Sequence, residues 1–399
     1  MSLESRRNLL VVVYAYPPSS LSAAVRWGAL TRYLAEMGHS ITVVTSDAFG
    51  APSAPDRVHV IRPRSLETAR VTGRRNFNPR VVWAPFAIRE ARRLLRRQTF
   101  DCFITTSPPE SAHLVGLLVG RHRPAWIADF RDGWCFEPYT VRFKTKGALL
   151  IDRWLEQRVA LKADATVGVT PPIADDLAER LGTRSRWIPN GWDPAASEDS
   201  DPASGSASDS GFTLVYTGAL WGEWGRTPEP LFRALKAVAS APDAPRLRLV
   251  HAGRLKPEDQ ALVDSTGVGD LFEHVGQLDR GNALALQRSA DALVLITSRN
   301  SSEATGKIFE YLTAGKPILA LADGNEAERI VRETNTGVVV PPDDVDAIAD
   351  VLRRAARGEL AREYAPRGID RYAYPRLAEE MAEVIEEAIT ARLSRTSRA

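Results

Sequence analysis

The chain has 399 residues, of which 44% are apolar and 26% are charged, and its formal net charge is +2. This composition is typical of a soluble globular protein, and it excludes a low-complexity or disordered chain. The length favours two domains of roughly 190 residues each over a single core.

The longest apolar run, Leu9–Tyr16, is stopped by two prolines. It is far shorter than the ~20 residues that a bilayer requires, and no small-residue cleavage site follows it. We therefore expect a buried first strand and a cytoplasmic protein. The two cysteines, Cys102 and Cys135, have no metal-ligand spacing, which favours a reducing compartment over a disulfide framework.

The charge is unevenly distributed along the chain. Residues 1–190 hold 28 Lys and Arg against 17 Asp and Glu, so this half carries +11 and the remainder carries −9. On a helix over 88–97, Ile88, Leu94 and Leu95 would face inward, and five arginines would face outward: Arg89, Arg92, Arg93, Arg96 and Arg97. A solvated helix is the favoured interpretation, and a peripheral contact with an anionic membrane or lipid-diphosphate acceptor is the alternative. Nucleic acid is not an expected partner, because no aromatic residues interleave with this run.

The N-terminal half alternates apolar strands with helical patterns. The run 8–16 predicts a strand, and the following helix has apolar residues at a period of 3.6 and Gly38 as its terminator. Further strands are predicted over 41–45, 101–106, 125–130 and 165–170. This alternation predicts an α/β domain with a parallel, doubly wound sheet, which we assign to residues 1–193.

Residues 194–211 lack large apolar side chains and are predicted to form a linker or a flexible insertion. Strand patterns then recur over 212–217, 246–253, 272–276, 291–297, 317–322 and 337–340. They predict a second Rossmann-like domain over 212–374, and the segment 375–399 contains a final helix, from 377 to about 393. Two such sheets facing each other would leave a cleft at their strand carboxyl ends, where ligands of open α/β sheets collect.

The segment 301–317, S-S-E-A-T-G-K-I-F-E-Y-L-T-A-G-K-P, follows the apolar run 292–296. It places Glu303, Gly306, Lys307 and Glu310 at one predicted helix start. Free N–H groups, a lysine and hydroxyl-binding carboxylates suit a diphosphate that carries sugars. An ordinary capped helix with solvated charges explains the residues equally well, so both interpretations stay open at this point.

Other candidate residues follow predicted strands. Gly218 marks a tight turn or a close approach to a diphosphate, and Arg226 is the nearest residue that could neutralise a phosphate. Trp221 and Trp224 would cover this site or pack its loop. Arg254 reaches a phosphate or base, or is a surface arginine.

In the first domain, three charged residues at one strand end (Asp129, Arg131 and Asp132) must pair with each other or with a ligand. His113 faces the cleft or has a capping or core role. D-D-V-D at 343–346 is interpreted as a helix N-cap and not as a metal site. The first strand is not followed by G-x-G-x-x-G, which counts against a dinucleotide oxidoreductase.

The segment 303–317 resembles the donor-site motif of GT-B glycosyltransferases of the retaining family 4. The likeness continues in order through Y-P-P-S-S, T-S-P-P-E-S-A-H (106–113), A-D-F-R-D-G-W (128–134), I-P-N-G-W-D (188–193), V-Y-T-G-A-L (215–220) and G-V-V-V-P-P-D-D (337–344). It covers nearly the whole chain. There are departures: six residues separate Glu303 from Glu310 where the family usually has seven, Ala219 replaces a common Arg, and many members have a His near Arg131.

The resemblance implies two Rossmann-like domains facing a cleft and a final helix that crosses back to the first domain. It implies a retaining glycosyltransferase that moves a sugar from a nucleotide-diphosphate sugar to a glycan, lipid-linked or natural-product acceptor, without a metal or other cofactor. The implied catalytic residues are Arg226, Lys307, Glu303, Arg131 and Asp132. The implied donor-binding residues are Gly218, Arg254, Val275, Gly276, Gly306, Ile308 and Glu310. The implied acceptor-binding residues are Ser19, Ser20, Ser22, Arg26, His113, Asp129 and Trp134. A sugar-nucleotide epimerase of the same architecture and a non-catalytic membrane-attached binding protein are the alternatives.

Overall fold

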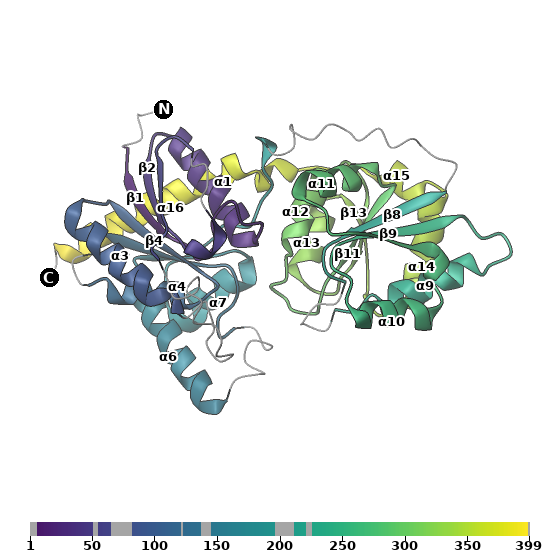
Figure 1. Cartoon of the computed structure of the whole chain (residues 1–399), viewed down its shortest axis with the longest axis horizontal. Coiled ribbons are helices and arrows are strands. Elements are labelled where there is room, and N and C mark those ends of the chain that lie inside the picture. The colour runs from purple at the N-terminus through teal and green to yellow at the C-terminus, as the bar shows by residue number, and fades with distance from the viewer. Residues whose placement is uncertain are drawn as a thin grey trace. The chain divides into compact units, whose positions relative to one another are not determined.

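The computed structural model describes residues 6–50, 55–64, 82–120, 123–136, 145–195, 211–220 and 226–397. The chain divides into two compact units (Figure 1). Unit 1 comprises Met1–Asn190 and Tyr374–Ala399, and unit 2 comprises Gly191–Ala373. Most of the predicted linker, together with Trp221 and Trp224, lies outside the described residues.

Unit 1 is built on a 7-stranded parallel sheet with the order β3-β2-β1-β4-β5-β6-β7. Its strands are β1 (Asn8–Val12), β2 (Ser40–Val44), β3 (Val58–Ile61), β4 (Cys102–Ser107), β5 (Ala125–Phe130), β6 (Ala165–Gly168) and β7 (Ser185–Trp187). Leu9 is in register with Ile41 of β2 and with Cys102 of β4. The inner strands are almost continuously apolar because helices cover both faces of the sheet.

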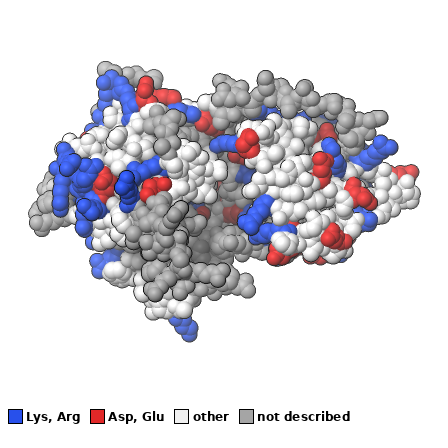
Figure 2. Space-filling model, in the orientation of Figure 1, with Lys and Arg blue, Asp and Glu red and all other residues white. Residues whose placement is uncertain are grey.

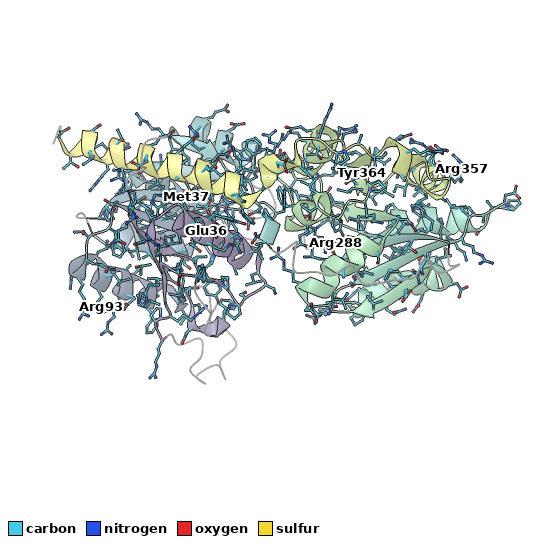
Figure 3. The ribbon with its side chains drawn as sticks, turned by 90° about the horizontal axis from the view of Figure 1, so that it is seen from above. Glu36, Met37, Arg93, Arg288, Arg357 and Tyr364 are labelled. Carbon is cyan, nitrogen blue, oxygen red and sulfur yellow. The ribbon has the colours of Figure 1, made fainter. Side chains whose placement is uncertain are left out.

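Helices flank this sheet in two layers: α1 (Ser22–Glu36), α3 (Ala84–Arg97), α4 (Ser111–Leu118), α6 (Lys146–Lys162), α7 (Pro171–Leu181) and α16 (Tyr374–Thr396), with the short turn η1 (Asp47–Phe49). On one face, Leu377 and Met381 of α16 pack in the same core as Leu30 of α1. Figure 3 shows α16 running along unit 1, with Glu36 and Met37 marking the end of α1. The other face is covered by residues of α3, α4 and α7.

Unit 2 has a 6-stranded parallel sheet with the order β10-β9-β8-β11-β12-β13. Its strands are β8 (Phe212–Thr217), β9 (Leu247–Ala252), β10 (Phe272–Gly276), β11 (Ala292–Ile296), β12 (Ile318–Leu321) and β13 (Gly337–Val340). Its helices are α9 (Glu229–Ala239), α10 (Pro257–Thr266), α11 (Arg280–Ser289), α12 (Gly306–Leu312), α13 (Glu326–Thr334), α14 (Val345–Ala356) and α15 (Glu359–Glu363), with the turns η2 (Gly269–Leu271) and η3 (Ile369–Tyr372).

The predicted fold class of two doubly wound α/β units is confirmed, and each strand order reverses at one point. The reversal lies between β1 and β4 in unit 1 and between β8 and β11 in unit 2. Loops leave such a pair of strands in opposite directions, so their carboxyl ends form the natural ligand position of an open α/β sheet. The loops after β8 and β11 carry Gly218, Arg226 and Glu303.

The arginine-rich helix has the predicted orientation. In α3 Leu94 is buried, Ile88 and Leu95 are half-buried, and all five arginines are exposed. Figure 3 shows Arg93 pointing away from the body of unit 1, and Figure 2 shows Lys and Arg side chains gathered on this side. Arg93 pairs with Glu90. In the part of the chain that the structure describes, no helix has both the length and the apolar character needed to cross a bilayer.

Candidate functional site

A glycine turn ends β8 in unit 2. Gly218 has a φ of +108°, a conformation that side-chain-bearing residues rarely adopt. Its N–H donates to Ala252 O at 2.7 Å, and its carbonyl accepts from His251 Nε2 at 2.8 Å. A Cβ at this position would lie 2.6 Å from Lys307 Cε. The turn therefore leaves room for the lysine side chain to pass directly over the backbone.

Lys307 supplies the positive charge next to that turn. It lies in the first turn of α12, which has only seven residues, so the charge of the side chain outweighs a short helix dipole. Its Nζ donates to Tyr216 Oη at 2.7 Å and lies 4.2 Å from the centroid of the tyrosine ring. Burial, reinforced by the nearby Arg226 guanidinium, lowers the pKa of Lys307 to about 7.

Arg226 and Glu303 form an incomplete ion pair beside the lysine. Arg226 Nη1 is 3.4 Å from Glu303 Oε1. The other carboxylate oxygen, Glu303 Oε2, accepts from the Ser298 N–H at 2.7 Å and from the Ser298 hydroxyl. Glu303 Oε1, Arg226 Nε and the hydroxyl of Thr305 are buried and have no hydrogen-bond partner among the described residues. Buried polar groups are rarely left in this state unless a ligand or water completes them.

Asn325, which precedes α13, fixes the loop after β11 through its side-chain amide. Its buried amide donates to Thr297 Oγ1 at 2.8 Å and to the carbonyl of Ser298 at 2.7 Å. One turn after Lys307, Glu310 remains partly exposed and lies 3.8 Å from Arg280. The arrangement therefore presents two cations to an anion and two carboxylates to hydroxyl groups, on a loop fixed by its own hydrogen bonds.

Comparisons with known proteins agree with this geometry. The family model described as Glycosyltransferase Family 4 matches residues 23–196, and the model described as Glycosyl transferases group 1 matches residues 211–357. The chain belongs to glycosyltransferase family 4. Within unit 2, the second match includes every residue of the cluster described above.

Curated relatives of this family-4 chain match it over part of their own length. An exopolysaccharide phosphotransferase of Streptomyces coelicolor is 25% identical over 76% of the chain and 30% of its own length. A phosphatidyl-myo-inositol mannosyltransferase of Mycobacterium leprae is 29% identical over 54% of the chain and 58% of its own length. The chain thus spans less than two thirds of the length of either relative.

Solved structures share the GT-B fold over nearly the whole chain. Sucrose-phosphate synthase from Thermosynechococcus elongatus has a TM-score of 0.67 at 18% identity, covering 98% of both chains. A putative UDP-N-acetylglucosamine 2-epimerase from Listeria monocytogenes has a TM-score of 0.60 at 11% identity, covering 96% of both chains. Because both transferases and epimerases share it, the fold alone does not separate these two reactions.

The donor residues implied by the family-4 motif occupy two places in unit 2. Gly218, Arg226, Glu303 and Lys307 come together as described above, with Gly306 at the start of α12. Ile308 is completely buried and its N–H donates to Thr305 O at 3.1 Å, so neither group faces solvent.

The remaining donor candidates belong to the neighbouring strands β9 and β10. Arg254 and Val275 are exposed. Gly276, with a φ of +81°, accepts from the N–H of Gly253 at 2.8 Å.

In unit 1, the predicted acceptor residues Arg26 and Asp129 form part of the scaffold. Both are fully buried, and Arg26 Nη2 is 3.2 Å from Asp129 Oδ1. The same guanidinium donates to the carbonyls of Ile188 and Pro189. Asp129 Oδ2 accepts from Trp27 Nε1 at 3.0 Å and from Thr106 Oγ1 at 2.8 Å. Both terminal nitrogens of Arg26 are therefore taken up by protein partners, while its buried Nε has no hydrogen-bond partner among the described residues.

Arg131 connects that scaffold to the loop after β1. Its guanidinium donates to Ser22 Oγ at 3.2 Å, to Thr106 Oγ1 at 3.2 Å and to Pro108 O at 2.8 Å. Burial lowers the pKa of Arg131, and the adjacent Asp132 carboxylate opposes that effect. Asp132 itself is exposed.

His113 and Trp134 pack within unit 1. His113 is fully buried, with ring nitrogens 2.8 Å from Thr105 Oγ1 and 2.9 Å from Ser107 Oγ. Burial lowers the pKa of His113 to about 3, so the ring is neutral at physiological pH. The indole of Trp134 stacks on it, with ring centroids 6.3 Å apart.

The acceptor candidates that reach solvent lie in the loop after β1 and at the start of α1. Ser20 and Ser22 are exposed, and Ser19 is half-buried.

Three side chains that support the site were not among the predicted residues. Tyr216 holds Lys307, Ser298 holds Glu303, and Asn325 holds the loop between them. Tyr216 lies in the segment V-Y-T-G, directly before the glycine turn, and this position is the only sequence signal it carries. Ser298 resembles an ordinary loop residue, although its partner Glu303 follows five residues later. Asn325 resembles a cap residue, because its partners Thr297 and Ser298 are distant in sequence.

Proposed function

We propose that the chain is a retaining glycosyltransferase that moves a sugar from a nucleotide-diphosphate sugar to a glycan, lipid-linked or natural-product acceptor. The observation that carries the proposal is the cluster of Lys307, Arg226 and Glu303 beside the Gly218 turn, with buried polar atoms still unpaired. Membership of glycosyltransferase family 4 supports the same reaction class.

Lys307 and Arg226 would hold the diphosphate. A pKa of about 7 makes the free lysine only partly charged near neutral pH. A bound diphosphate would raise that pKa, since opposite charges favour the ammonium form, and Lys307 would take up a proton as the donor binds. Arg226 stays charged throughout, and its planar guanidinium can bind two phosphate oxygens at once.

These cations would also promote bond cleavage. As the bond between sugar and phosphate breaks, negative charge grows on the departing phosphate, next to groups already in position. The departing phosphate would accept the proton of the acceptor hydroxyl on the same face of the sugar, which retains the configuration. No protein base is then required, which is consistent with an arginine, and no histidine, at position 131.

The carboxylates would orient the carbohydrate parts of the donor. Glu303 keeps Oε1 free of hydrogen bonds from the described residues, so this oxygen can accept one from a sugar hydroxyl. Glu310 is partly exposed one turn later and is assigned to the ribose. Catalysis by these residues requires no metal ion, so the proposed mechanism is metal-independent.

On the acceptor side, we assign Ser20, Ser22 and Asp132 to acceptor hydroxyls, because they are exposed at the carboxyl ends of β1 and β5. Arg131 would fix Ser22 through its hydrogen bond. The mycobacterial relative is named for a phosphatidyl-myo-inositol substrate, which favours a lipid-linked acceptor and a peripheral contact with an anionic membrane.

A thermal-shift screen against UDP, GDP, dTDP and ADP sugars tests the donor proposal. Ligand at about a hundred times its dissociation constant should add roughly 2.7 kcal/mol to the unfolding free energy. The proposal is contradicted if no nucleotide sugar raises the melting temperature, or if Lys307→Ala leaves that shift unchanged. Incubation of the bound sugar nucleotide alone separates the reactions, since an epimerase would isomerise it without any acceptor.

A further inference from the structure

Helix α6 of unit 1 carries an unusual share of the exposed apolar surface. In the described part of the chain, nine large hydrophobic side chains are exposed, and four of them lie on this helix. These four are Leu150, Ile151, Trp154 and Leu161, with exposures of 66%, 61%, 54% and 53%. Single exposed hydrophobic residues are ordinary, whereas a contiguous group usually marks an interaction surface.

The four residues form one stripe along α6. At 3.6 residues per turn they fall within an arc of roughly 100°, on the side of the helix away from the core. The opposite side is anchored in unit 1, because Val159 is buried and the buried Glu156 accepts from Arg180 at 2.8 Å. The stripe therefore faces solvent, while the opposite side of α6 packs against unit 1.

Positive charges border the stripe on both sides. By the same helical spacing, Lys146 and Arg153 flank the Leu150 edge and Lys162 flanks the Ile151 edge, and all three are exposed. Arg158 is also exposed, and its guanidinium lies 5.0 Å from the ring centroid of Trp154. At the lower end of unit 1, where α6 lies in Figure 1, Figure 2 shows white residues with a blue tip below the residues drawn in grey.

By the same helical spacing, the two acidic residues of α6 lie on the side of the helix away from the stripe. Asp152 is half-buried, and Glu156 is enclosed and held by Arg180. A second copy of the chain seated on the stripe would bring like charges together at both borders. A phospholipid surface fits both features, because its acyl boundary accepts the apolar side chains and its anionic headgroups accept the basic ones.

We propose that α6 lies in the plane of an anionic membrane surface, with Leu150, Ile151, Trp154 and Leu161 inserted at the headgroup boundary. Tryptophan is well suited to this depth, where one part of the ring is apolar and the N–H stays hydrated. The arginine face of α3 lacks an exposed large hydrophobic residue among its described positions. We therefore assign membrane insertion to α6 and not to α3.

The test is co-sedimentation of the full chain with vesicles of phosphatidylcholine and phosphatidylglycerol. We expect binding that weakens on phosphatidylcholine alone and at high salt, since each basic residue near the surface contributes about fivefold in affinity. The double variant Leu150→Gln, Trp154→Gln should bind at least about tenfold more weakly. Two double variants serve as matched controls. Leu278→Gln combined with Leu393→Gln removes exposed hydrophobic residues outside α6, and Arg96→Gln combined with Arg97→Gln removes basic residues of α3. Both should reduce vesicle binding far less.

A fluorescence experiment locates the contact. Vesicles with brominated acyl chains should quench part of the tryptophan emission of the wild-type chain. Trp154→Phe should still bind these vesicles and lose that quenched part. If the double variant sediments like the wild type, or if quenching persists in Trp154→Phe, α6 is not the inserted element.

Size-exclusion chromatography with light scattering tests the alternative that a second copy of the chain covers the stripe. A wild-type dimer that the double variant converts to a monomer, without vesicle binding by either, would assign the stripe to a second copy and overturn the proposal. The melting-temperature shift caused by nucleotide sugar should be the same in the double variant and the wild type. Failure of the membrane proposal is thereby distinguished from failure of the proposed glycosyltransferase function.

Discussion

The two units contain similar charged clusters at their strand carboxyl ends, and the carboxylates of the two clusters differ in how completely they are hydrogen-bonded. In unit 1, Asp129 is fully buried and both of its oxygens accept hydrogen bonds from the protein. In unit 2, Glu303 Oε1 has no hydrogen-bond partner among the described residues, and Lys307 remains partly exposed. The comparison teaches that a charged residue at a strand end becomes a candidate ligand contact only where the protein leaves it unsatisfied.

The largest effect that this comparison predicts is on stability. Asp129→Ala leaves Arg26 buried without its carboxylate, and loss of one partner of a buried pair costs about 3–5 kcal/mol. Urea unfolding followed by circular dichroism measures the loss. The matched control is Asp175→Ala on α7, where the side chain is exposed and a change within about 0.5 kcal/mol is expected. Equal effects of the two substitutions would contradict the structural role of Asp129.

The second prediction concerns turnover. Lys307→Ala should lower kcat by about 10²–10³-fold, because under the proposed mechanism it removes a cation from the departing phosphate. Its melting temperature should not fall, since the lysine is held at a desolvation cost. Lys236→Ala, an exposed lysine on α9, is the control and should retain wild-type turnover. If Lys307→Ala keeps normal activity, the unit 2 cluster has a structural role only, like the Arg26–Asp129 pair of unit 1.

The third prediction is a pH dependence of donor affinity. Lys307 has a pKa of about 7 in the free protein, so its side chain is mostly charged well below that pH and mostly neutral well above it. In the proposed function the charged form holds the diphosphate. The dissociation constant should therefore rise by up to about tenfold per pH unit above 7, in calorimetric titrations. The increase of the dissociation constant with pH should disappear in Lys307→Gln. An affinity that is flat above pH 7 in the wild type would mean that this lysine does not meet the donor.

The lowered pKa of Lys307 also determines the direction in which the unfolding free energy changes with pH. The ordinary pKa of lysine is 10.5, so between about 7 and 10.5 the unfolded chain holds a proton that the folded unit releases. The contribution of Lys307 to stability should therefore increase as pH rises through this range. The difference in unfolding free energy between the wild type and Lys307→Gln, measured at several pH values, isolates it.

The smallest predicted effect comes from Tyr216→Phe, which keeps the ring under Lys307 and removes the hydroxyl at 2.7 Å. A hydrogen bond of this kind contributes about 0.5–1.5 kcal/mol, so donor affinity should fall by about two- to tenfold. The pH profile should also move, which a purely structural tyrosine would not cause. Tyr364→Phe, at a half-buried tyrosine of unit 2, is the control. An unchanged profile would remove Tyr216 from the site.

Strands were predicted well wherever they are buried on both faces. The runs that become β1, β4, β5 and β11 are almost continuously apolar, and all were predicted. The edge strands β3 and β7 were missed. Val58–Ile61 and Ser185–Trp187 have exposed positions and polar side chains, so they lack the apolar continuity that marks an inner strand.

The candidate site was less predictable from the same sequence. Both the Asp129–Asp132 segment and the Glu303–Glu310 segment place charges after an apolar strand, and the sequence pattern of the two is alike. The hydrogen-bond partners of the two carboxylates distinguish the segments: folding brings Trp27 and Thr106 to Asp129, whereas Ser298 lies in the same loop as Glu303, five residues before it. Hydrogen-bond satisfaction depends on those partners and not on the charged residue itself.

Strand alternation, the glycine turns and the order of the motifs were determined by the sequence alone, because they depend on local periodicity and backbone conformation. The tertiary structure decided which charges are enclosed and which remain open. It also decided that α6 turns its apolar stripe outward and not toward the core. Burial depends on which surfaces meet after the chain has folded, and residue spacing along the chain does not record that.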